Sequence, residues 1–72
     1  MTHILVVDDN AVQQRILGHM LRKAGYEVEI AGDAFEALDL VAEETFDLAI
    51  VDIAMPDMDG VELLIALRDQ PA

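Results

Sequence analysis

The sequence predicts an open, parallel α/β domain, and three observations support this prediction. Strand-like and helix-like segments alternate along the 72 residues in the order β-α-β-α-β-α. Two of the strand-like segments are continuously apolar, which is typical of strands covered on both faces. The third alternates apolar and acidic residues, which is typical of an edge strand. Such a sequence predicts a parallel sheet with right-handed crossovers and helices on both faces.

The first apolar strand and the first helix occupy the start of the chain. His3–Val7 is a short, β-branched, apolar run, and Asp9 or Asn10 after it can cap a helix. The helix is expected over residues 11–24, and Gly25 follows it at a position that favours a left-handed residue. We expect its apolar stripe to contain Val12, Ile16, Leu17, Met20 and Leu21.

The remaining elements follow the same alternation. Residues 26–31 form the alternating strand, and Asp33 with Glu36 gives the D-x-x-E start signal of a second helix. We expect the inner stripe of that helix to contain Phe35, Leu38, Val41 and Ala42. Residues 46–52 form the second apolar strand. A third helix is expected to carry Val61, Leu64, Ile65 and Arg68.

Acidic residues end the two apolar strands. The edge character of residues 26–31 predicts the strand order 2-1-3, and ligands of open α/β sheets bind beyond the carboxyl ends of the strands where the chain reverses. Asp8 and Asp9 end the first strand, and Asp52 ends the third. Because neighbouring strands lie about 4.8 Å apart, the sequence predicts that these three carboxylates share one pocket.

Three crowded carboxylates suggest a metal and phosphoryl site. Such charges repel one another unless a cation lies among them, and Mg²⁺ favours one or two carboxylates together with waters and a phosphate oxygen. We interpret Asp8 and Asp9 as the pair that holds Mg²⁺, with Asp52 contributing one oxygen. Asp52 can then act as a nucleophile toward phosphorus. The alternative for a single residue such as Asp9 is a helix cap, but the three residues together favour the metal site.

The composition excludes several classes of function. Four Lys and Arg against fifteen Asp and Glu give a net charge of −11, so we expect no direct binding to nucleic acid or to an anionic membrane. The absence of cysteine excludes disulfides, thiolate metal sites and cysteine nucleophiles. No apolar run approaches the roughly 20 residues that span a bilayer, and the N-terminus lacks the features of a signal peptide. We therefore expect a cytoplasmic protein.

The other candidate ligands support no competing site. Asp57 and Asp59 fit the first turn of a helix, where acidic residues favour the helix dipole. An EF-hand is excluded because the loop that would place Gly60 at its invariant glycine has no acidic residue at either end. His3 and His19 have no partner at ligand spacing in the sequence, so we expect them at the surface or at the edge of the core.

Two motifs identify a family resemblance. ILVVDDN at residues 4–10 and LAIVDIAMPDMDG at residues 48–60, with the spacing between them, resemble the receiver domain of two-component response regulators. The resemblance covers the whole chain and implies a flavodoxin-like parallel sheet. It also implies that a sensor histidine kinase or a phosphotransfer protein donates a phosphoryl group to the domain. The domain is then not an enzyme beyond self-catalysed phosphotransfer and dephosphorylation.

The resemblance implies a role for each acidic residue. Asp52 corresponds to the phosphoacceptor, and Asp8 and Asp9 correspond to the acidic pair that binds Mg²⁺. The backbone carbonyl of Ala54 would be a further metal ligand.

A complete receiver domain has five strands and five helices, whereas residues 1–72 offer three of each. We expect the chain to be the N-terminal part of a single receiver domain, without strands 4–5 and helices 4–5, and phosphorylation to be impaired. The Ser or Thr and the Lys that contact the phosphoryl group in the family have no counterpart, since the single lysine, Lys23, lies on the first helix.

The third strand would then be an apolar edge that invites pairing with another chain. The alternative function is therefore a non-catalytic assembly module that homodimerises through this edge. An independent magnesium-dependent phosphatase ranks below both.

Overall fold

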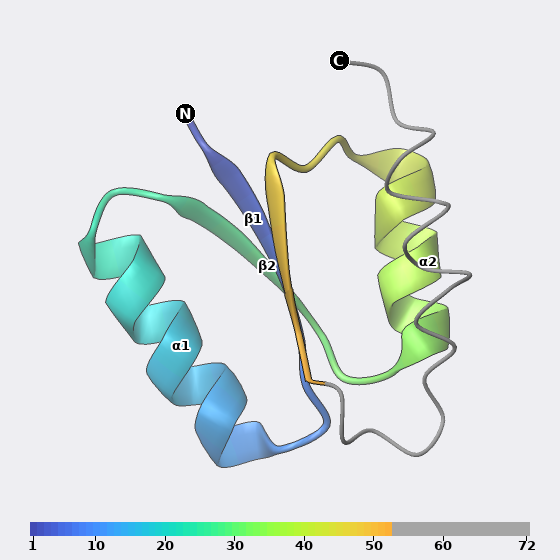
Figure 1. The fold of residues 1–72 in the computed structure, drawn as a ribbon, viewed down its shortest axis with the longest axis horizontal. Helices are drawn as coiled ribbons and strands as arrows, with labels where there is room; N and C mark the ends of the chain where they lie inside the picture. The colour runs from blue at the N-terminus through green and yellow to red at the C-terminus, as the bar shows by residue number, and fades with distance from the viewer. Residues whose placement is uncertain (53–72) are drawn as a thin grey trace.

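The structure, a computed structural model, describes residues 1–52. In this part of the chain, strands and helices alternate as predicted (Figure 1). The elements are β1 (His3–Val7), α1 (Ala11–Lys23), β2 (Glu27–Ala31), α2 (Ala34–Glu43) and β3 (Leu48–Val51). The predicted third helix, Ala54, Asp57 and Asp59 lie outside the described residues. Within residues 1–52, neither helix is long and apolar enough to cross a membrane.

The three strands form one parallel sheet in the order β2-β1-β3, which confirms the predicted order. β1 is the middle strand, and Val7 is in register with Ala31 on one side and with Val51 on the other. The two helices lie on opposite faces of the sheet (Figure 1). All three strands therefore end at the same edge of the sheet.

The core is built around β1. Its last four residues, 4–7, are at most 2% exposed. Leu5 and Val7 belong to the cluster that packs under α2, and Ile4 and Val6 belong to the cluster that packs under α1. This two-sided burial explains why the strand is continuously apolar.

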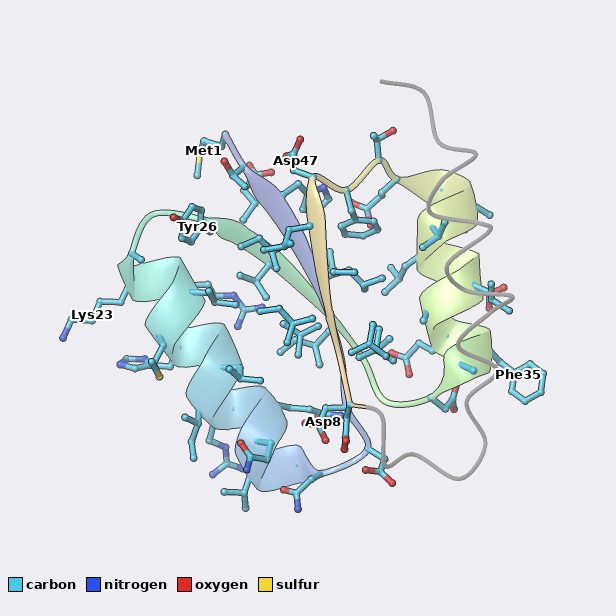
Figure 2. The ribbon with its side chains drawn as sticks, in the orientation of Figure 1. Met1, Asp8, Lys23, Tyr26, Phe35 and Asp47 are labelled. Carbon is cyan, nitrogen blue, oxygen red and sulfur yellow. The ribbon has the colours of Figure 1, made fainter. Side chains whose placement is uncertain are left out.

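The inner face of α2 differs from the prediction. Ala34, Ala37 and Val41 are buried, whereas Phe35 is 74% exposed and Ala42 is also exposed. The prediction was therefore wrong for Phe35 and Ala42. Successive helical residues are rotated by about 100°, and the small alanines form the face that approaches the sheet. The larger aromatic side chain beside them points to solvent (Figure 2).

The inner face of α1 is also narrower than predicted. Leu17 and Leu21 pack against the sheet, and Gly18 is buried between them. A Cβ atom at Gly18 would lie 3.0 Å from the Cδ1 atom of Ile30, so this face of the helix lies close against β2. The prediction was wrong for three stripe residues, which are exposed: Val12, Ile16 and Met20.

Local signals at the helix ends agree with the sequence. Asp33 caps α2, because its Oδ1 accepts a hydrogen bond of 2.7 Å from the Glu36 amide. Glu36 in turn accepts a bond of 3.3 Å from the Gly32 amide, so the predicted start signal is confirmed. Gly25 follows α1 with a φ of 97°, the left-handed conformation that favours glycine.

We expect Leu5→Ala to lower the free energy of unfolding by about 2–5 kcal/mol, because the side chain is fully buried and its loss leaves a cavity. Phe35→Ala is the matched control and should change it by less than about 0.5 kcal/mol, because Phe35 is largely exposed. Urea titration followed by circular dichroism measures both. Equal losses in the two variants would contradict the described burial.

Candidate functional site

Three carboxylates meet at the carboxyl end of the sheet. Asp8 and Asp9 follow β1, and Asp52 follows β3. Each offers one oxygen, and these three oxygens lie within 4.8 Å of one another. Figure 2 shows Asp8 at this end of the sheet, beside the end of β3. The predicted convergence is confirmed, and we refer to these three residues as the aspartate cluster.

Backbone hydrogen bonds hold two members of the aspartate cluster in place. The Asp8 amide donates to the Ala31 carbonyl at 3.0 Å, and the Asp52 amide donates to the Val7 carbonyl at 2.9 Å. These bonds extend the two parallel ladders by one residue beyond the strands. Asp8 and Asp52 are therefore positioned by the sheet itself.

The three carboxylates differ in burial. Asp8 is 8% exposed and is the one buried charged residue among residues 1–52, whereas Asp52 is half-buried and Asp9 is exposed. The Asn10 amide donates a hydrogen bond of 2.9 Å to Asp8 Oδ1. A buried carboxylate needs such hydrogen bonds or a cation. A donor set made only of carboxylate oxygens suits a hard cation such as Mg²⁺.

The turn between β1 and α1 shows which residue caps the helix. Asn10 Oδ1 accepts hydrogen bonds from the amides of Val12 and Gln13 at 2.9 and 3.1 Å, so Asn10 is the N-cap. The Gln14 side chain also donates to the Asp8 carbonyl. Since Asn10 is the N-cap of α1, Asp9 does not have the capping role that was the alternative to metal binding.

A second group of potential ligands was missed by sequence reasoning. His3 Nε2 lies 3.6 Å from Glu44 Oε1, and ligand atoms of His3, Glu29 and Glu44 lie within 4.8 Å of one another. His3 therefore has partners that lie far from it in the sequence, and its expected place at the edge of the core is confirmed. Spacing along the sequence gave no signal because the partners lie on β2 and after α2. His19 is exposed on α1.

Comparison with known proteins decides the family. A family model for the response regulator receiver domain matches residues 4–72. The chain belongs to this family. It is a receiver domain of two-component signalling, and its sheet order and helical layers are those of the flavodoxin-like fold.

The receiver domain resembles proteins from several kingdoms. It is 51% identical over 63 residues to the two-component response regulator ORR26 of Oryza sativa subsp. japonica. The match covers 85% of this chain and 11% of that protein. The chain thus spans a small part of this relative. A Burkholderia pseudomallei response regulator, whose crystal structure contains a phosphorylated aspartic acid, a calcium ion and citrate, gives a TM-score of 0.85 at 35% identity, covering 96% of this chain and 41% of that one.

A third similar structure contains a partner protein. It is the Saccharomyces cerevisiae complex of the phosphotransfer protein Ypd1 with the receiver domain of the response regulator Ssk1. The match has a TM-score of 0.80 at 32% identity and covers 94% of this chain and 47% of that one.

Replacing the cap residue should weaken the receiver domain without removing a carboxylate. We expect Asn10→Ala to lower the free energy of unfolding by about 1 kcal/mol, because the amides of Val12 and Gln13 lose their acceptor. Asn10→Ser keeps a capping oxygen and should differ from the original chain by only a few tenths of a kcal/mol. Chemical denaturation measures both, and an unchanged stability of Asn10→Ala would contradict the cap.

Proposed function

We propose that this receiver domain accepts a phosphoryl group on Asp52, with Mg²⁺ held by Asp8, Asp9 and Asp52. The observation that carries the proposal is the approach of these three carboxylates to within 4.8 Å at the end of neighbouring strands. The backbone carbonyl of Ala54, outside the described residues, is the further ligand in this proposal. The donor is a phosphohistidine of a sensor kinase or phosphotransfer protein, and the proposed location is the cytoplasm.

The burial of each carboxylate suits a different task. Asp8 is buried and oriented by the Asn10 amide, so it can provide a fixed metal ligand. Asp9 is exposed and close to both other carboxylates, so it can complete the metal site from the solvent side. Asp52 is half-buried at the end of β3, where a phosphoryl donor can reach it.

The proposed reaction is a transfer between two nucleophiles. An Oδ atom of Asp52 attacks phosphorus, and a P–O bond forms as the P–N bond of phosphohistidine breaks. The electron pair of the broken bond stays on the imidazole nitrogen of the donor. Asp8, Asp9 and Asp52 would hold Mg²⁺, which when bound would neutralise negative charge on the transferring group. The phosphoryl group remains on Asp52, so the domain is a phosphoacceptor and not an enzyme that releases a product.

The comparisons support this proposal at the level of chemistry. The Burkholderia pseudomallei regulator holds a phosphorylated aspartic acid together with a divalent cation. The yeast receiver domain was crystallised with a histidine phosphotransfer protein. Both facts concern those proteins. For this chain, an aspartate acceptor and a phosphotransfer partner are therefore the first hypotheses to test.

Incubation with acetyl phosphate and Mg²⁺ should add one phosphoryl group to the 72-residue chain. We expect the reaction to be slow, to require Mg²⁺ and to be lost in Asp52→Asn, because the variant lacks the nucleophilic oxygen. Intact-mass spectrometry measures the adduct. Asp39→Asn, an exposed carboxylate on α2, is the control and should react as the original chain does. An adduct that persists in Asp52→Asn would reject Asp52 as the acceptor.

The exposed edge of β3 supports the second candidate function, an assembly module. In the sheet formed by residues 1–52, β3 is an outer strand, and Leu48 at its start is 53% exposed. An apolar outer strand offers unpaired backbone groups and side chains to another chain. We propose a homodimer through this edge as the alternative to phosphoryl signalling.

Sedimentation analysis tests this alternative. The average mass should rise with protein concentration, and added salt should favour association by screening the net charge of −11. Leu48→Lys should abolish the association, since a charge on an edge strand opposes pairing. Phe35→Lys, at an apolar position on α2 that is 74% exposed, should leave it unchanged. A monomer at every concentration would exclude the dimer.

A further inference from the structure

A second set of metal-binding side chains lies near the amino end of the sheet. His3 begins β1, Glu29 lies in β2 and Glu44 follows α2, so three separate elements contribute. All three residues are half-buried, and their ligand atoms lie within 4.8 Å of one another. We infer that this group, the histidine cluster, is a Zn²⁺ site. The inference does not depend on phosphoryl transfer at the aspartate cluster.

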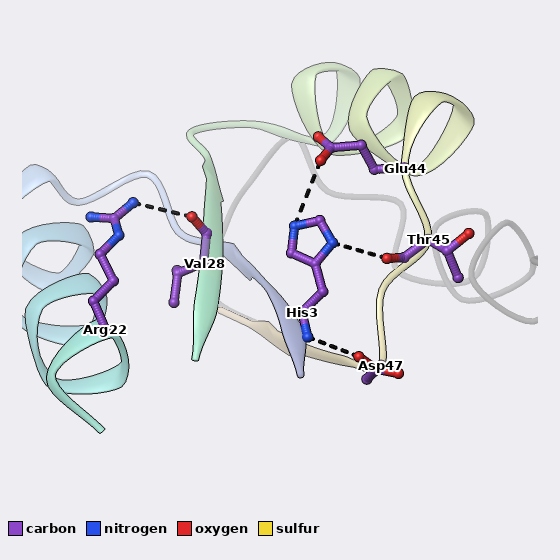
Figure 3. Close-up of polar contacts among 6 residues, drawn as sticks. All are labelled: His3, Arg22, Val28, Glu44, Thr45 and Asp47. Atoms are coloured by element: carbon purple, nitrogen blue, oxygen red, sulfur yellow. Dashed lines mark hydrogen bonds and ion pairs between the residues drawn. The ribbon is translucent and has the colours of Figure 1, made fainter. Parts of the chain in front are cut away.

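The orientation of the His3 ring is the first observation behind this inference. Nδ1 lies 3.0 Å from the Thr45 carbonyl oxygen (Figure 3). Because a carbonyl only accepts hydrogen bonds, Nδ1 is the donor in this contact, and Nε2 is the ring atom that faces Glu44 and is placed to bind a metal. Metal-binding histidines commonly donate their other N–H to a carbonyl in this way. The ring also packs on Phe46, with centroids 4.4 Å apart.

The distance between His3 and Glu44 is the second observation. Nε2 and Oε1 are 3.6 Å apart, which is longer than the 2.7–3.2 Å expected of an N–H···O hydrogen bond. Zinc binds nitrogen at about 2.0–2.1 Å and carboxylate oxygen at about 2.0–2.2 Å, so tetrahedral geometry places two such ligands about 3.4 Å apart. The observed separation is close to that of two ligands sharing one ion.

The local charge is the third observation. Glu44 is the C-cap of α2, and the last turn of that helix has no basic residue. A helix C-terminus carries partial negative charge, which adds to the two carboxylates. The lysine and arginine side chains within residues 1–52 all lie on α1, on the other face of the sheet. The histidine cluster therefore attracts a cation, and its imidazole favours Zn²⁺ over Mg²⁺.

Calorimetric titration of Zn²⁺ into the 72-residue chain tests the site. Saturating Mg²⁺ is included so that the aspartate cluster does not compete. We expect one equivalent of Zn²⁺ to bind, and His3→Gln and Glu44→Gln each to weaken binding by at least about tenfold, since loss of an outer partner alone costs 10–100-fold. Zinc should also shift the imidazole NMR signals of His3 and raise the thermal midpoint of unfolding.

Two controls separate this site from other zinc ligands. His19→Gln removes the other histidine, and Asp52→Asn removes a carboxylate of the aspartate cluster; both should bind Zn²⁺ within about twofold of the original chain. Glu44→Gln keeps the His3 ring and its bond to Thr45, so it tests the site if His3→Gln does not fold. No zinc binding up to about 1 mM would overturn the inference. An affinity that is unchanged in Glu44→Gln, or lost in Asp52→Asn, would also overturn the inference. If His3 only forms an ion pair with Glu44 in its protonated form, no zinc binding should be seen.

Discussion

The pairing of β1 with a parallel strand on each side determines where the aspartate cluster of this receiver domain lies. Val7 is in register with Ala31 and with Val51, and the residues that follow Val7 and Val51 are Asp8 and Asp52. A slip of one residue in either pairing would turn a strand's apolar side chains away from the core. The same slip would move one carboxylate of the aspartate cluster away from the others. Core packing and site geometry therefore depend on one register.

This dependence also links the stability of the domain to its charge. The four largest fully buried side chains, residues 4–7, directly precede the buried carboxylate of Asp8. Burying an ionised group opposes folding unless hydrogen bonds or a cation compensate, and the Asn10 amide supplies one such bond. A ligand that binds only the folded state stabilises that state by mass action. Any cation held by the aspartate cluster therefore stabilises the register on which the cluster depends.

The sequence predicted the structure well wherever a local pattern of residues is compatible with only one kind of structural element. Continuous apolar runs identified β1 and β3, and the capping side chain of Asp33 and the left-handed Gly25 marked helix ends. The helix faces were less predictable, because an alanine and a phenylalanine both fit an apolar stripe. The close approach of α2 to the sheet selected the alanines and left Phe35 in solvent. The His3 partners were unpredictable for a related reason, since tertiary structure alone brings them together.

The direction of the helices places helix dipoles of opposite sign at the two ends of the sheet. In a parallel sheet with helical crossovers, helices start at the carboxyl end of the strands and finish at the amino end. The aspartate cluster accordingly lies beside the start of α1, where amide groups and partial positive charge favour anions such as a phosphoryl group. The histidine cluster lies at the finish of α2, where partial negative charge opposes an anion and favours a cation. The topology that places the start of α1 beside the proposed phosphoryl site thus places the end of α2 beside the proposed zinc site.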